Sequence, residues 1–190
     1  MPNFRAAILP ALALASVFGC SSTPNPVANG GVDIQLQNPA AAVGATCPDR
    51  SFELTLFGQD SNKSLLVDGS NNASVKCTVG GSSFKGTVSL SGQTFSVSGS
   101  VTQQGGVYVS TNAIVSINLA TNSYQTDTSA PCTITFTSYS PGSGGSNSME
   151  AGGSGSIQCG DLLDEASGGF ACAINSTFAT TDQFKFENCQ

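Results

Sequence analysis

The sequence has no histidine and no tryptophan, and only 9% of its 190 residues are charged. Without histidine the chain cannot build a Ser-His-Asp triad, a Cys-His dyad or an imidazole metal site. Its net charge of -6 leaves no basic face for nucleic acid phosphates, so we expect no nucleic acid partner. We therefore predict that the protein is not an enzyme and has no catalytic, cofactor-binding or metal-binding residues.

The N-terminal residues contain one apolar run, from Ala6 to Phe18, which follows the single charge of Arg5. At about a dozen residues this run is too short to span a bilayer, but it is typical of the apolar region of a signal peptide. It leads into the sequence Val17-Phe18-Gly19-Cys20. The segment therefore predicts export of the chain.

This motif resembles the lipobox of bacterial lipoprotein signal peptides, in which an aliphatic residue and a small residue precede an invariant cysteine. The resemblance implies cleavage between Gly19 and Cys20, and a diacylated, N-acylated Cys20 that would carry palmitate-like chains. Several acyl chains on one residue give lasting attachment to a membrane. Ser21, as the second mature residue, implies sorting to the outer membrane. An ordinary secretory signal that happens to precede a cysteine is the alternative.

We divide the chain into a signal peptide at 1–19, a lipidated N-terminus and flexible tether at 20–31, and one domain at 32–190. Six cysteines remain after Cys20, and an even number in an exported chain predicts three disulfides. These are Cys47, Cys77, Cys132, Cys159, Cys172 and Cys189. Six cysteines allow about 15 connectivities. We expect Cys47 to pair with Cys189 near the two ends of the domain, and the inner four to pair within the core.

Short alternating runs separated by glycine and serine predict an all-β domain. Between Val75 and Leu119 the turn lengths and the alternation agree on a four-stranded meander with one apolar face. The first two turns predict Val79 opposite Phe84, Cys77 opposite Gly86, Val75 opposite Val88, Leu90 opposite Gln93, Ser89 opposite Thr94 and Val88 opposite Phe95. A third, three-residue loop at 103–105 predicts Val101 opposite Val107 and Gly99 opposite Val109. The residues Thr111, Ala113, Val115, Ile117 and Leu119 then keep the same parity.

A sheet with one apolar face must bury it against a second sheet, so the domain is predicted to be a disulfide-stapled, jelly-roll-like β-sandwich. A closed β-barrel is the alternative. Residues 141–156 are rich in glycine and serine and are expected to form a loop.

Three carboxylates at Asp161, Asp164 and Glu165 have the spacing of one helical turn. A solvated turn is the first interpretation of this spacing, and a calcium site is the second. A carboxylate-dependent hydrolase is a further alternative, and it would have to use these three residues together with Glu53 or Glu150.

Candidate glycan contacts are Tyr108, Tyr124 and Tyr139, because aromatic rings stack on sugars. The alternation places Tyr108 and Tyr139 on the solvent side. The same alternation predicts a wide, nearly uncharged hydroxyl surface, which could bind polysaccharide or simply keep the strands soluble. Its members are Thr87, Ser89, Thr94, Ser96, Ser98, Ser100, Thr102, Ser110, Thr133, Thr135 and Thr137.

We therefore expect a monomeric lipoprotein of the outer membrane that works as a binding or structural module of the cell envelope. Its expected partners are the membrane, through the lipid anchor, and an envelope protein or a glycan. Calcium-dependent or glycan-dependent adhesion and carboxylate hydrolysis are the alternatives.

Overall fold

The computed structural model describes residues 26–39, 46–50, 52–58, 64–142, 151–175 and 182–190. These residues form thirteen strands and no helix, so the prediction of an all-β fold is confirmed. No segment among them forms a helix long and apolar enough to cross a bilayer. The predicted signal peptide, Cys20 and Glu150 lie outside the described residues.

The strands, in chain order, are β1 (Asn29–Gln37), β2 (Glu53–Leu56), β3 (Leu66–Val67), β4 (Ser74–Val79), β5 (Ser83–Leu90), β6 (Gln93–Ser100), β7 (Thr102–Gln104), β8 (Val107–Asn118), β9 (Ser123–Thr126), β10 (Cys132–Ser140), β11 (Gly152–Asp164), β12 (Phe170–Ile174) and β13 (Phe184–Glu187). β1 includes Gly30 and Gly31, so the domain begins before residue 32, the boundary predicted from the sequence.

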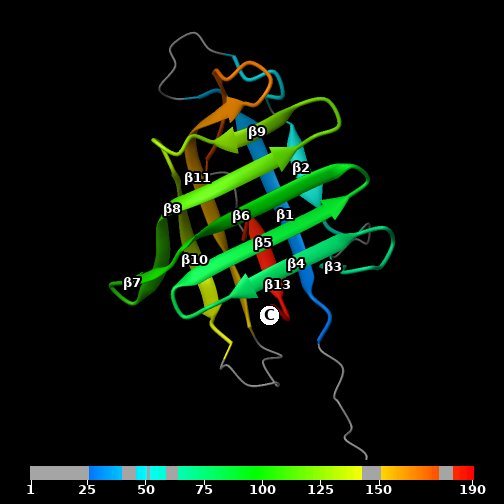
Figure 1. The fold of residues 1–190 in the computed structure, drawn as a ribbon, viewed down its shortest axis with the longest axis vertical. Coiled ribbons are helices and arrows are strands. Elements are labelled where there is room, and N and C mark those ends of the chain that lie inside the picture. Colours follow the sequence, from blue (N-terminus) through cyan, green and yellow to red (C-terminus); the bar gives the residue numbers. More distant parts are fainter. Residues whose placement is uncertain (1–25, 40–45, 51, 59–63, 143–150, 176–181) are drawn as a thin grey trace, which may run out of the picture.

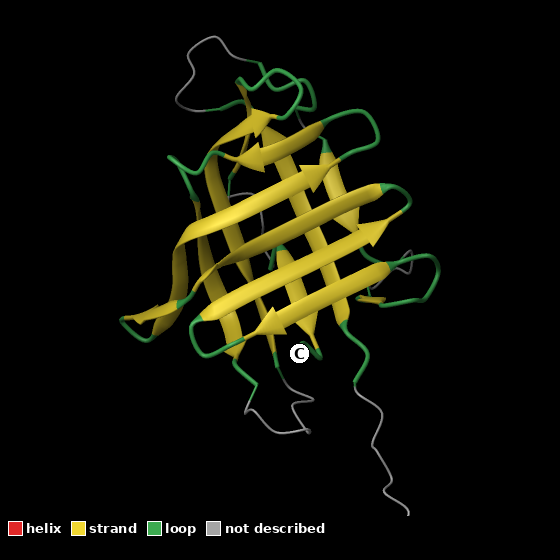
Figure 2. Ribbon diagram, viewed as in Figure 1, coloured by secondary structure: helices red, strands yellow, loops and turns green. Residues whose placement is uncertain are grey.

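All thirteen strands belong to one sheet that folds over into two layers. β4, β5, β6 and the second half of β8 form the front layer in Figure 1, and β1, β13, β11 and β10 form the rear layer, with the two sets of strands crossing at a large angle. β8 pairs with β10 through residues 108–113 and with β6 through residues 114–118, so it connects the layers. Figure 2 shows the two layers of strands, and the buried apolar residues of both layers form one core, as the β-sandwich prediction requires.

The first two hairpins have the predicted register. Every predicted pair between β4 and β5 and between β5 and β6 is present. The second turn uses Ser91 and Gly92, whose φ angles of 53° and 81° are those of a two-residue turn with both central residues left-handed. Alternation and turn length were therefore sufficient to position these three strands.

The prediction for the third turn is wrong. The turn consists of Gly105 and Gly106, with φ angles of 58° and 88°, and it pairs Gln104 with Val107. Two adjacent glycines accept these positive angles at little cost, so the tighter turn is favoured over the three-residue loop. The register of β8 against β10 also shifts beyond Ser110, so Thr111 is exposed while Ala113 is buried.

Four phenylalanines fill the core between the layers. The ring of Phe84, on β5, lies 5.3 Å from Phe136 on β10, 5.6 Å from Phe184 and 5.8 Å from Phe186 on β13, measured between centroids. All four are at most 4% exposed. Packed aromatic rings of this kind contribute beyond the area that they bury, so this cluster holds the front layer to the rear layer.

The six cysteines form three buried disulfides, as predicted. The bridges are Cys47–Cys172, Cys77–Cys189 and Cys132–Cys159. The expected pair of Cys47 with Cys189 is wrong. β12 and β13 both lie between β1 and β11, but each pairs with a different part of these two strands. β13 pairs with the start of β1 and β12 with its end, which places Cys189 and Cys47 at opposite ends of that strand.

Candidate functional site

A polar trough of about 430 Å³ runs over the outer face of the rear layer, along the first half of β11. Its floor includes Gly152 and Ser154 of β11, one wall includes Ser138 of β10, and the other wall includes Lys185 and Glu187 of β13. Three strands that are neighbours in the sheet therefore build the trough together.

The trough exists because β11 carries almost no side chains at this point. A Cβ atom on Gly152 would lie 2.4 Å from the carbonyl oxygen of Phe186, and one on Gly155 would lie 2.2 Å from that of Thr135. Both obstacles are backbone atoms of neighbouring strands, so the close packing of the sheet requires glycine at these positions. The prediction that residues 141–156 form one loop is therefore wrong for residues 152–156, which lie within β11.

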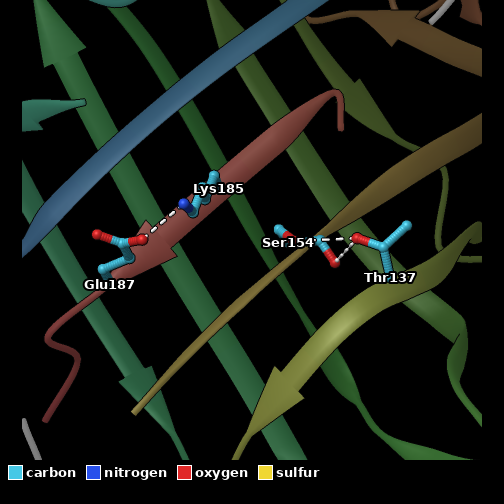
Figure 3. A network of polar contacts seen from close by, with 4 residues as sticks. All are labelled: Thr137, Ser154, Lys185 and Glu187. Atoms are coloured by element: carbon cyan, nitrogen blue, oxygen red, sulfur yellow. Dashed lines mark hydrogen bonds and ion pairs between the residues drawn. The ribbon is translucent and has the colours of Figure 1, made fainter. Parts of the chain in front are cut away.

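A chain of hydroxyl and carboxylate groups lies beside the floor of the trough, and Figure 3 shows part of it. The Oγ1 of Thr137 donates to Oδ1 of Asp182 at 2.6 Å, and the Oγ atoms of Thr137 and Ser154 are 2.9 Å apart. The carbonyl oxygen of Ser154 is a second acceptor for the Thr137 hydroxyl at 3.1 Å, and either hydroxyl can donate in the bond between Thr137 and Ser154. The register of β10 shifts between Phe136 and Ser138, and this irregularity includes Thr137.

An ion pair lies on the wall formed by β13. The Nζ of Lys185 is 2.6 Å from Oε1 of Glu187, and the two side chains are 47% and 44% exposed. They point the same way because residues two apart on a strand share a face. An exposed pair of this kind is worth at most about 1 kcal/mol, so a ligand can replace it at small cost.

The trough therefore combines two carboxylates, one ammonium group, the side chain of Asn188 and several serine hydroxyls. Carboxylates accept hydrogen bonds, the ammonium group donates them, and the hydroxyls do both. A ligand with many hydroxyl groups offers donors and acceptors that match this set. Of the trough residues, sequence alternation could place Lys185 and Glu187 on an outer face, but no sequence signal joined them to Thr137 and Asp182.

Of the carboxylates proposed from the sequence, the four that lie in the described residues are not in this trough. Asp161 and Asp164 belong to the second half of β11, Glu165 follows in a turn, and Glu53 belongs to β2. The expected helical turn is absent, because β11 continues as a strand to Asp164. The described segments contain no group of three or more carboxylate, cysteine or histidine side chains that could hold a metal ion.

Asp164 has a local structural role in the turn that follows β11. Its carboxylate accepts hydrogen bonds from Oγ of Ser167 at 2.8 Å and from the backbone N–H of Ala166 at 3.0 Å. The Ser167 hydroxyl and then the Ala166 amide hold the pKa of Asp164 below its usual range, because both stabilise the charged form. Asp164 therefore closes the turn that follows β11.

The three tyrosines are not an exposed sugar platform. Tyr124 is fully buried and donates its hydroxyl to Asp49. Tyr108 and Tyr139 pack partly buried against the core with ring centroids 4.9 Å apart, and Tyr139 donates to backbone carbonyls at Gly80 and Ser83. The register shift between Phe136 and Ser138 precedes Tyr139 and reverses its face, whereas Tyr108 lies before the shift in β8 at residues 110–113 and follows a turn that is one residue shorter than predicted, so the predicted exposure of both residues is wrong.

The predicted hydroxyl surface is divided between the two layers. Ser89, Thr94, Ser96 and Ser98 lie in register on β5 and β6 in the front layer, whereas Thr133 and Thr135 lie on β10. Ser110, expected on this surface, is only 1% exposed. Comparisons with protein families, curated proteins and solved structures found no match for this chain.

Proposed function

We propose that the protein is a lipid-anchored module of the bacterial outer membrane that holds a hydroxyl-rich ligand, a glycan chain, in the trough on β11. The observation that carries the anchor is the pairing of the cysteines. All six cysteines of the domain bond to one another, so no other cysteine of this sequence remains for Cys20. This leaves the Cys20 thiol for acylation, as the lipobox resemblance implies.

The proposed anchor leaves the domain some freedom above the membrane. β1 begins at Asn29, nine residues after Cys20. An extended chain spans at most about 3.3–3.6 Å per residue, so the domain would reach up to about 30 Å from the acylated residue. Disulfides stabilise such an exported domain against unfolding outside the reducing cytoplasm.

The anchor is tested by the intact mass of the protein extracted from membranes, with and without reduction and alkylation. We expect an increment equal to three acyl chains and glycerol on Cys20, and six further cysteines that alkylate only after reduction. A mature protein that carries no lipid, or that alkylates before reduction, would overturn the anchored module.

The ligand is tested with the detergent-solubilised mature protein on immobilised envelope polysaccharides. Lys185→Gln removes the ammonium group of the trough, and we expect at least a tenfold loss of affinity, the usual effect of one charge-assisted hydrogen bond. Lys85→Gln is the matched control, since Lys85 lies on β5 in the front layer. Equal effects of the two changes would refute the trough as the site. Release of new reducing ends would instead support the hydrolase alternative.

A further inference from the structure

β4 is the last strand on one side of the sheet, and its outer edge is covered by single residues. Gln190 donates its N–H to the carbonyl of Cys77 at 3.0 Å and accepts from the N–H of Val79 at 3.1 Å. The carboxylate of Asp68 accepts from the N–H of Val75 at 2.8 Å. No neighbouring strand contributes to this cover in the described part of the chain.

The cover leaves a gap in the middle of the edge. Alternate residues of an edge strand direct their backbone groups to the same side, so the carbonyl of Val75 and the N–H of Cys77 also face outward. Within the described residues neither group has a hydrogen-bond partner. They border a hollow of about 530 Å³ that Asp68, Lys76 and Gln190 also line. The edge is therefore partly open.

The Cys77–Cys189 disulfide fixes the cover in place. Cys189 directly precedes Gln190, and its bond to Cys77 holds Gln190 against β4. Natural sheets commonly cover or interrupt an edge strand, because an open edge pairs with other chains. The bridge therefore keeps Gln190 against β4, and with it the edge stays covered.

We propose that β4 is a pairing edge for a second copy of this chain, and that Gln190 and the Cys77–Cys189 bridge keep it closed. With the cover in place the protein is a monomer. With Gln190 displaced, two β4 strands pair antiparallel and join the front layers of two copies. The ladder uses the N–H and C=O of Cys77, the C=O of Val75 and the N–H of Val79, while Asp68 keeps the N–H of Val75. This interaction surface lies apart from the trough and does not depend on the proposed ligand.

The sequence of β4 suits pairing with itself. An antiparallel register centred on Cys77 places Cys77 opposite Cys77 of the second copy and Val75 opposite Val79. Lys76 then lies opposite Thr78, so the two lysines do not face each other across the new ladder. Val75, Cys77 and Val79 point into the core, whereas Lys76 is exposed. Such a ladder extends both the apolar and the polar face of each copy, and cross-strand pairs of this kind stabilise a sheet.

The test compares three variants of the detergent-solubilised mature protein by sedimentation equilibrium over a range of concentrations. Cys77→Ser with Cys189→Ser removes the bridge, and we expect a concentration-dependent doubling of the protein mass. Cys132→Ser with Cys159→Ser removes another bridge and should leave a monomer. Cys77→Pro with Cys189→Ser removes the bridge and also the central N–H of the proposed ladder. This variant should still fold, because an edge position accepts proline without losing a bond inside the sheet. It should stay monomeric, because the proposed ladder has lost its central N–H.

Deletion of Gln190 alone provides the second measurement, because all three disulfides remain and the fold is retained. We expect this chain to dimerise as well, and this result decides the matter if the variants without a bridge do not fold. A monomeric deletion variant together with a monomeric Cys77→Ser, Cys189→Ser variant would overturn the proposal. Dimerisation of the proline variant would also overturn it, since association would then use another surface.

Discussion

The most direct test of the fold is an alanine at Gly155 on β11. The new Cβ atom would lie 2.2 Å from the carbonyl oxygen of Thr135 and 2.9 Å from Cα of Phe136. Both are backbone atoms of β10, and Phe136 is the residue opposite Gly155 in the ladder. Ordinary contact begins at 3.4 Å, so the strands must separate by about 1.2 Å at this point.

That separation breaks or weakens about two ladder hydrogen bonds, each worth about 1 kcal/mol net, and adds a cost of overpacking of about 1–3 kcal/mol. We expect Gly155→Ala to lower the free energy of unfolding by about 3–5 kcal/mol. A domain of this size loses about 2–4 °C of melting temperature per kcal/mol, so the expected change is about 6–20 °C.

Gly160→Ala is the matched control, since it lies on the same strand with nothing within 4 Å of the new Cβ atom. We expect it to be neutral, or more stable by up to about 1 kcal/mol, because alanine reduces the entropy of the unfolded chain. Urea unfolding with all disulfides intact measures both variants. A difference of less than about 0.5 kcal/mol between them would refute the packing argument.

Three further changes address the core and the pH dependence of stability. Phe84→Ala removes a ring that contacts three others, and we expect a loss of about 3–5 kcal/mol in denaturant unfolding. Burial, followed by the hydrogen bond to Asp49, raises the pKa of Tyr124, so stability should be full below about pH 10 and fall by up to about 1.4 kcal/mol per pH unit above it. Tyr124→Phe should flatten this alkaline slope in melts from pH 9 to 12. The lowered pKa of Asp164 means that its contribution is present above about pH 4 and is lost as the pH falls, and Asp164→Asn should remove that part of the acid slope.

The sequence predicted the local parts of this fold well. The hairpins of β4, β5 and β6 depend only on turn length and alternation, and both can be read within about thirty residues. The two bulges were not predictable in this way, because each depends on how β10 pairs with a strand distant in the sequence. A shift separates the alternation on its two sides, so Tyr139, after the shift in β10, and Tyr108, between the shorter turn and the shift in β8, were both placed on the wrong side.

The features that the sequence could not predict depend on contacts between residues that are far apart in the chain. The cysteines were correctly expected to form bridges, but their pairing depends on β12 and β13 entering the same interval between β1 and β11. The trough has the same origin, because Thr137 and Asp182 are 45 residues apart in the chain. Alternation could identify Lys185 as an outward residue, yet it could not identify its neighbours across the sheet.

The glycines of β11 link the core of the domain to the proposed binding site. On the inner side, a Cβ atom at Gly153 would come within 3.2 Å of the rings of Phe84 and Phe136, so the absence of a side chain makes room for the aromatic cluster. On the outer side, the absence of a side chain at Gly152 leaves the floor of the trough open. A stretch of β11 in which Ser154 is the one residue with a side chain among residues 152–155 therefore separates the tightly packed core from the trough. A larger residue in this floor disturbs stability before it can fill the site, so changes that test ligand binding must be made in the walls, at Lys185 or Ser138.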